Sequence, residues 1–137
     1  MRAFFYGTLI DADVRAAVLG AAPRRLSVEP ALLPGYRRVQ MRKRSYPIIV
    51  PDARAAVAGV LMRGLNRADF ARLLDYETDE YRAISAEVAT RSGKRIVAKV
   101  FAASPRALPS PTPWNAADWQ RRCKRAFLRR LRAGAGV

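Results

Sequence analysis

The sequence contains no histidine and a single cysteine, Cys123, and these two absences exclude several common active sites. Without histidine, the chain has no Ser-His-Asp triad, no Cys-His pair and no histidine-ligated metal. One cysteine forms neither an intrachain disulfide nor a thiolate zinc site. Acid–base chemistry at neutral pH therefore falls to a carboxylate, a lysine or a tyrosine whose pKa the fold has shifted.

Acidic residues and lysines are also scarce. Eleven Asp and Glu stand against 26 Lys and Arg, which gives a net charge of +15, and only four of the basic residues are lysines. A strongly basic domain often binds nucleic acid, because neutralising phosphates releases condensed counterions. However, no zinc finger or helix-turn-helix spacing accompanies the basic clusters at residues 37–44 and near the C-terminus. We favour a solvated basic surface and keep a nucleic-acid-binding module as an alternative.

Long hydrophobic runs are missing as well. The longest, residues 46–50 and 55–62, are far too short to span a bilayer, and the apolar N-terminal stretch is too brief for a signal peptide. We expect a cytoplasmic protein without a membrane partner. The length of 137 residues, half of them hydrophobic, predicts one domain over residues 1–137, in which residues 103–137 form a proline-rich segment and a C-terminal helix.

Short apolar or alternating segments between turn residues predict most of the chain to be strand. The expected strands cover residues 2–6, 46–50, 55–61, 81–90 and 95–102, and residues 26–40 are expected to be extended chain broken by Pro30, Pro34 and Gly35. Residues 91–94 form the turn of a predicted hairpin. Gly59 indicates a bulge or a close backbone approach. Residues 104–113 are expected to lack regular structure.

Three helices are predicted from caps and helical periodicity. The first, over residues 14–19, follows Asp11 and Asp13, and the second begins at Asn66 and runs to about Tyr76. In the second helix, Phe70, Leu73 and Leu74 form one expected buried stripe. In the third helix Asp118 is the expected cap, and its apolar stripe consists of Trp119, Cys123, Phe127 and Leu131. Short strands that outnumber helices predict an α+β fold built on a small curled mixed β-sheet or barrel of about five to seven strands, with flanking helices and a C-terminal basic helix.

Two motifs carry chemical information. The segment Phe4-Phe5-Tyr6-Gly7-Thr8-Leu9 is a strand that runs into a tight turn, and Leu73-Leu74-Asp75-Tyr76-Glu77 is followed by Glu80-Tyr81-Arg82 and an alternating strand. Their order and spacing resemble the two signatures of the gamma-glutamyl cyclotransferase-like family, in its small bacterial, gamma-glutamylamine cyclotransferase-like form. The resemblance covers residues 2–101, and the basic C-terminal helix matches weakly.

The resemblance implies an intramolecular reaction. In the family, the alpha-amine of a gamma-glutamyl group attacks its own gamma-carbonyl, which gives 5-oxoproline and a free amine or amino acid. No cofactor or metal is implied, because the nucleophile and the electrophile belong to one molecule. The turn holds the alpha-carboxylate in the family, so the residues implied for that role are Tyr6, Gly7, Thr8 and Leu9. Backbone N–H groups brought together at such a turn can form an anion-binding concavity.

Glu77 is the implied general acid/base. It would deprotonate the substrate ammonium and later protonate the leaving amine, provided that burial raises its pKa toward neutrality. Family members often have glycine and further acidic residues just after this glutamate, whereas this chain reads Glu77-Thr78-Asp79-Glu80-Tyr81. A register in which Glu80 occupies the site therefore stays open. Tyr46 and Tyr81 are the further expected pocket residues, and Arg82 is expected on the outer face.

Several questions stay open at this point. The sequence leaves the leaving group of the substrate undecided, and it does not separate an enzyme from a non-catalytic member of the same fold that binds a small gamma-glutamyl ligand. It is compatible with either a monomer or a homodimer. The expected partner is a small-molecule gamma-glutamyl substrate.

Overall fold

The computed structural model describes residues 1–20 and 26–134. Its strands are β1 (Ala3–Phe5), β2 (Ser27–Met41), β3 (Pro47–Arg63), β4 (Tyr81–Thr90), β5 (Arg95–Ala103) and β6 (Pro109–Pro113). Its helices are a 3-10 turn, η1 (Thr8–Ile10), and α1 (Ala12–Leu19), α2 (Arg67–Tyr76), α3 (Ala116–Arg122) and α4 (Lys124–Arg132). The predicted mixed α+β fold is confirmed.

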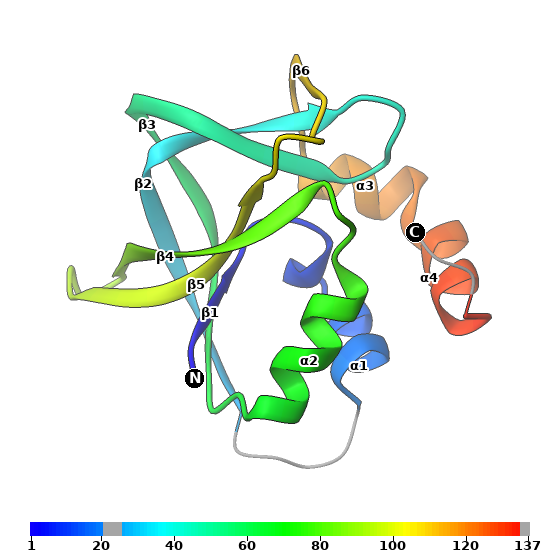
Figure 1. Cartoon of the computed structure of the whole chain (residues 1–137), viewed down its shortest axis with the longest axis horizontal. Coiled ribbons are helices and arrows are strands. Elements are labelled where there is room, and N and C mark those ends of the chain that lie inside the picture. The colour runs from blue at the N-terminus through cyan, green and yellow to red at the C-terminus, as the bar shows by residue number, and fades with distance from the viewer. Residues whose placement is uncertain (21–25, 135–137) are drawn as a thin grey trace.

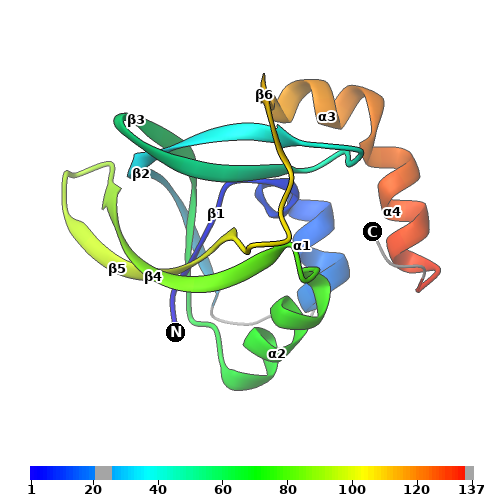
Figure 2. The same cartoon turned by 45° about the horizontal axis from the view of Figure 1, so that its top comes forward.

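The strands form one mixed sheet that closes on itself. Its order is β3-β1-β5-β4-β2-β6, and the additional pairing of β2 with β3 closes the first five strands into a barrel. Among the strands of the described residues, only β1 and β5 pair in parallel. The long β2–β3 and β4–β5 hairpins supply most of the antiparallel ladder. Helices α1 and α2 lie side by side against one side of the barrel, and α3 and α4 follow on from β6 (Figures 1 and 2).

Alternation along the strands builds two hydrophobic cores. Phe4 belongs to a cluster made of strand residues and Tyr6, which is the barrel interior. Its neighbour Phe5 belongs to a cluster that includes residues of all four α-helices. The same alternation separates Val100 from Phe101 on β5. Because successive side chains of a strand point to opposite faces, β1 and β5 both fill the barrel and carry the helical layer.

The predicted helix starts are largely confirmed. Asp11 caps α1 by accepting from the backbone N–H groups of Asp13 and Val14, and Asn66 forms a capping box with Asp69 at the start of α2. One part of the predicted stripe on α2 is wrong, because Leu74 is 53% exposed. Leu73 is the residue of this helix that enters the core completely.

Two predicted interruptions do not occur. The broken extended chain of residues 26–40 is instead the continuous strand β2, and the two strands predicted at residues 46–50 and 55–61 are one strand, β3. Gly35, with φ of 86°, forms an irregularity at which Pro34 pairs with Ala56 and Tyr36 pairs with Pro51. Apart from β3, β2 has only short pairings with β4 and β6, so it tolerates prolines as an edge strand does.

The C-terminal region also differs from its prediction. The segment expected to lack regular structure contains β6, which pairs with β2. The side chain of Asn115, rather than Asp118, caps α3, and Asp118 lies in the first turn. The single predicted helix is divided at Cys123 into α3 and α4, although the expected stripe still faces the core: Trp119 and Phe127 are buried, and Cys123 and Leu131 pack against the cluster.

A polar cluster centred on the buried Asp11 joins the first helix to the last ones. The Asp11 carboxylate, 5% exposed, accepts from Gln120 Nε2 at 3.0 Å and lies 2.8 Å from Lys124 Nζ. Lys124 also contacts Asp13 at 2.8 Å. Although burial alone would raise the pKa of Asp11, its hydrogen bonds with Lys124 and Gln120 hold that pKa below its usual value. The α3–α4 unit is therefore fixed directly behind the turn that follows β1.

Candidate functional site

A single pocket brings the two sequence motifs together. It lies at the end of β1, and its empty space is about 460 Å³ when the part open to solvent is included. Its walls come from β1 and η1, from the start of β3 and from the end of α2 with the start of β4. The lining residues are Phe4, Phe5, Tyr6, Gly7, Thr8, Leu9, Tyr46, Pro47, Tyr76, Glu77, Thr78, Tyr81 and Phe101.

The turn after β1 is held in place by several contacts. The Tyr6 hydroxyl donates to the Phe101 carbonyl, and Arg38 Nη1 donates to the Tyr6 carbonyl at 2.9 Å. A Cβ on Gly7 would lie 3.1 Å from the ring of Pro47, so glycine lets the turn pack against the start of β3. Gly7 immediately precedes η1, and the first backbone N–H groups of such a turn have no partner within it. The turn thus offers fixed donors for an anion.

Glu77 lies where α2 ends. It is the C-cap of the helix, and its backbone N–H donates to the Leu73 carbonyl at 3.0 Å. Its side chain is partly exposed through the pocket, and burial raises the pKa of its carboxyl group from the usual 4.5 to about 8. At neutral pH this carboxyl therefore holds its proton more often than not, which is the condition of a group that can both give and take a proton.

Tyrosines surround this carboxyl group. Burial, reinforced by the charge of Glu77, raises the pKa of Tyr6 and Tyr81 well above the usual value, so both phenols remain neutral. The Tyr81 hydroxyl donates to the Pro47 carbonyl, and the Tyr76 hydroxyl lies 2.6 Å from Thr8 Oγ1. These bonds fix the rings and leave hydroxyl lone pairs as acceptors inside an otherwise apolar pocket.

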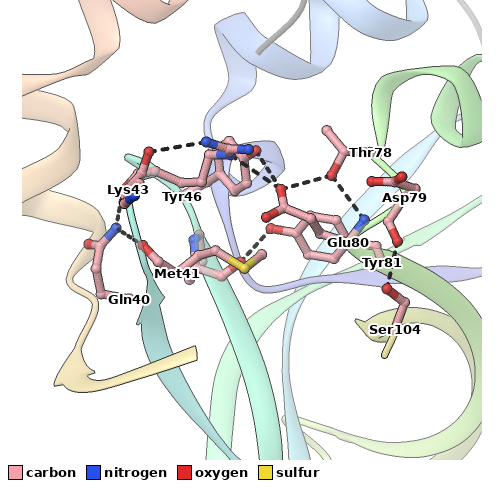
Figure 3. A network of polar contacts seen from close by, with 11 residues as sticks. Gln40, Met41, Lys43, Tyr46, Thr78, Asp79, Glu80, Tyr81 and Ser104 are labelled. Atoms are coloured by element: carbon pink, nitrogen blue, oxygen red, sulfur yellow. Dashed lines mark hydrogen bonds and ion pairs between the residues drawn. The ribbon is translucent and has the colours of Figure 1, made fainter. Parts of the chain in front are cut away.

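Glu80 has a different environment. Its carboxylate accepts from the Tyr46 hydroxyl at 3.0 Å and from Thr78 Oγ1 at 3.1 Å, and Arg44 Nε lies 3.3 Å away. Figure 3 shows Glu80 between Tyr46 and Thr78, in a network that runs from Gln40 and Lys43 at one end to Asp79 and Ser104 at the other. Glu80 is buried and its lone pairs are used within the protein. It does not line the pocket, whereas Glu77 does.

The structure brings the catalytic and substrate-binding residues expected from the sequence into one pocket, with the exception of Glu80, the alternative to Glu77. These are Tyr6, Gly7, Thr8, Leu9, Tyr46, Glu77 and Tyr81. Arg82, expected on the outer face, is exposed. Sequence reasoning missed Phe101 and Thr78 as lining residues, and it treated Tyr76 only as a neighbour of Glu77. The alternation of buried and exposed side chains along β5 was the available signal for Phe101. It places Phe101 at the pocket only when the parallel pairing of β5 with β1 is known.

Two absences among the described residues bear on other classes of site. Within the described residues, no cluster of three or more Cys, Asp or Glu side chains is arranged to hold a metal ion. None of the helices in residues 1–20 and 26–134 is long and apolar enough to cross a membrane.

The closed mixed barrel, with its pocket at the end of the first strand, is the gamma-glutamyl cyclotransferase-like fold. The chain belongs to the family described as "Gamma-glutamyl cyclotransferase, AIG2-like", whose profile matches residues 3–121. The match continues past the residues that carried the resemblance in the sequence and includes β6 and most of α3.

Relatives and solved structures agree with this membership. AIG2-like protein A of Arabidopsis thaliana is 28% identical over 127 residues, which are 91% of this chain and 75% of that protein. A solution structure of an Arabidopsis thaliana protein superposes with a TM-score of 0.70 at 26% identity, over 93% of this chain and 85% of the other. A structure titled "Gamma-glutamyl cyclotransferase" superposes with a TM-score of 0.65 at 18% identity, over 81% and 72% of the two chains, and shows likeness of fold.

Proposed function

We propose that the protein is a gamma-glutamyl cyclotransferase that releases 5-oxoproline from a gamma-glutamyl amine or gamma-glutamyl amino acid. The observation that carries the proposal is Glu77, a carboxyl group with a pKa raised to about 8 in a pocket that also contains the Gly7–Leu9 turn. A group whose pKa lies near the working pH is the most effective general acid/base. Membership of the family and the proposed chemistry of the pocket point the same way.

In the proposed reaction, ionised Glu77 removes a proton from the substrate's alpha-ammonium group. The free amine then attacks the gamma-carbonyl carbon, a C–N bond closes the five-membered ring, and the original amide C–N bond breaks. The proton held by Glu77 passes to the departing nitrogen, which leaves as an amine. The ring nitrogen loses its second proton to solvent, and the released amine takes up a proton from solvent to become an ammonium ion. Two protons thus leave the alpha-nitrogen and two reach the leaving nitrogen, and Glu77 returns to its ionised state.

The turn and the tyrosines position the substrate. The N–H groups at the start of η1 are the proposed donors to the alpha-carboxylate, because they point from a fixed turn and need an acceptor. The hydroxyl protons of Tyr6 and Tyr81 are already donated to the carbonyls of Phe101 and Pro47. Their oxygens are therefore proposed as acceptors for the substrate ammonium, which places the reacting nitrogen near Glu77.

Release of 5-oxoproline tests the proposal directly. The purified protein should form 5-oxoproline from at least one member of a panel of gamma-glutamyl amines and gamma-glutamyl amino acids, measured by chromatography against a no-enzyme control. The Glu87→Gln variant, which changes an exposed carboxylate on β4, serves as a folded control and should match the unmodified protein. If the protein binds panel members but forms no 5-oxoproline, it is a binding member of the fold and the proposed activity is wrong.

The pH dependence should show the raised pKa of Glu77. Only the ionised carboxylate accepts a proton, so kcat/KM should rise by about tenfold per pH unit on the acid side and level off as pH passes about 8. A pH–rate profile of kcat/KM measured from pH 5 to 9 checks this. An acid limb centred between pH 4 and 5 would show that a solvated carboxylate acts instead.

A further inference from the structure

A second concavity adjoins the proposed active site. This groove encloses about 1070 Å³, including the part open to solvent, and lies between the turn that joins β2 to β3 and the start of the α3–α4 unit. Its lining residues are Gln40, Met41, Arg42, Lys43, Arg44, Ser45, Pro113, Trp114, Asn115, Asp118, Trp119, Arg122 and Cys123. Four of these side chains are cationic and one is anionic.

The cations of the groove are largely uncompensated. Asp118 pairs with Arg121, which lies outside the groove, and Arg44 pairs with Glu80. Among the described residues, no carboxylate lies within 4 Å of the charged groups of Arg42, Lys43 and Arg122. Arg42 Nε donates to the Pro109 carbonyl at 3.4 Å, which leaves its charge uncompensated. Three positive charges thus face one concave surface without a carboxylate partner among the described residues, and such an arrangement attracts an anion.

The turn that carries Arg42 and Lys43 is held in place by hydrogen bonds. The Arg42 backbone N–H donates to the Leu108 carbonyl at 2.8 Å, and Trp114 Nε1 donates to the Ser45 carbonyl at 2.8 Å. Lys43 has φ of 60°, in the left-handed region that residues other than glycine rarely adopt. Strained conformations of this kind tend to occur at ligand-binding turns. A turn that is already ordered loses less conformational entropy when a ligand binds.

The same segment joins the groove to the pocket. Residues 40–45 line the groove, and the next two, Tyr46 and Pro47, line the pocket. Glu80 connects the two sites, because it contacts Arg44 of the groove and accepts from Tyr46 of the pocket (Figure 3). A leaving group that extends from the pocket past Tyr46 toward residues 44 and 45 would therefore meet the cationic groove.

We infer that the groove is the leaving-group subsite, and that it selects gamma-glutamyl compounds whose leaving group carries a carboxylate. Arg42 and Arg122 are its specificity-determining residues, and Arg44 stays with Glu80. The inference rests on the proposed function, because it assigns the part of the substrate beyond the gamma-amide. It predicts discrimination against neutral leaving groups and against cationic ones such as diamines.

Matched substrates isolate the charge of the leaving group. We would compare gamma-glutamyl conjugates of glycine, beta-alanine and 4-aminobutyrate with the corresponding conjugates of glycinamide, beta-alaninamide and 4-aminobutyramide. Each pair has the same length and differs only in carboxylate against carboxamide. For at least one length, kcat/KM should be about tenfold higher for the carboxylate, and the ratio should fall as salt is raised.

Variants identify the residues responsible. The double variant Arg42→Gln with Arg122→Gln should bring the carboxylate-to-carboxamide ratio close to one, because kcat/KM should fall more for the carboxylate substrate than for the carboxamide. Arg130→Gln removes one charge from an exposed position of α4 outside the groove and should keep the ratio. The inference is wrong if the carboxylate-to-carboxamide ratio is already near one in the unmodified protein. It is also wrong if Arg130→Gln lowers this ratio as much as the double variant does.

Tryptophan fluorescence separates this inference from the proposed reaction. The chain contains only two tryptophans, Trp114 and Trp119, and both line the groove. Titration with the 4-aminobutyrate conjugate should change their emission, whereas the carboxamide should do so only at about tenfold higher concentration. Suppose that no conjugate yields 5-oxoproline, but the carboxylate still changes the emission at a lower concentration than the carboxamide, and the double variant abolishes this difference. In that case the proposed reaction is wrong and the anion site is supported. If no 5-oxoproline forms and the emission also stays unchanged, both the proposed reaction and the proposed anion site are wrong.

Discussion

In the Glu77→Gln variant, the rate of 5-oxoproline release is expected to fall by a factor of about 10² to 10⁴, which is the usual contribution of general acid–base catalysis. Glutamine keeps the shape of glutamate and cannot exchange a proton, so substrate binding should change much less than kcat. The measurement is kcat and KM for the best substrate of the panel at pH 8. Near-normal turnover would remove Glu77 from the mechanism.

The same substitution should stabilise the fold at alkaline pH. Because the pKa of Glu77 is raised from 4.5 to about 8 on folding, the native state binds a proton that the unfolded state lacks between these values. The free energy of unfolding therefore decreases progressively as pH rises from 4.5 through about 8. The total decrease caused by Glu77 is at most about 5 kcal/mol. Glu77→Gln lacks this penalty, and urea unfolding at pH 8 should show it more stable than the unmodified protein by about 1 kcal/mol or more.

Glu80→Gln is the comparison that fixes the register of the motif. It leaves an acceptor for the Tyr46 hydroxyl but removes the charge opposite Arg44. We expect it to destabilise the protein while the turnover of the folded fraction falls less than about tenfold. Loss of turnover in Glu80→Gln together with normal turnover in Glu77→Gln would assign the catalytic role to Glu80.

Gly59→Ala is expected to destabilise the protein by about 3 kcal/mol or more, at the upper end of the cost of overpacking a core. A Cβ at this position would lie 2.2 Å from the Phe5 carbonyl oxygen and 2.7 Å from Phe4 Cζ, so β1 would have to move away from β3. The displaced strand is the one that leads into Tyr6 and Gly7. Thermal and urea unfolding, with turnover measured on the folded fraction, check the prediction.

A second substitution separates the two contacts of Gly59. Adding Phe4→Leu to Gly59→Ala removes the contact with the ring of Phe4 but leaves the contact with the Phe5 carbonyl, which belongs to the backbone. Stability should therefore not be restored by the double variant. Recovery to within about 1 kcal/mol of Phe4→Leu alone would mean that the Phe5 carbonyl is not the obstacle.

The features that were predictable from the sequence are those with local causes. The β4–β5 hairpin follows from alternation on both sides of a four-residue turn, and α2 follows from the capping pair Asn66 and Asp69. The Tyr6–Leu9 turn and Glu77 were recognisable as short strings in a fixed order. Their meeting in one pocket depends on the parallel pairing of β1 with β5, which local patterns do not encode.

The features that escaped prediction depend on tertiary context. The prolines of β2 looked like strand breakers, but β2 is paired along its length mainly with β3, so their missing N–H groups cost little. Asn115 and Asp118 are both good capping residues. The sequence alone does not show which of them caps α3, because this depends on the residue at which the backbone becomes helical. The contact between Arg44 and Glu80 joins residues 36 positions apart and has no local sequence signal.

The cluster at Asp11 has a consequence for how the protein is made. A ribosome delivers Asp11 early, whereas its partners Gln120 and Lys124 are synthesised late, with a separation of 109 residues for Gln120. Until those partners emerge, a carboxylate that the finished protein buries has only its own helix to neutralise it. The turn that follows β1 therefore acquires the support of α3 and α4 only after these last helices have been synthesised.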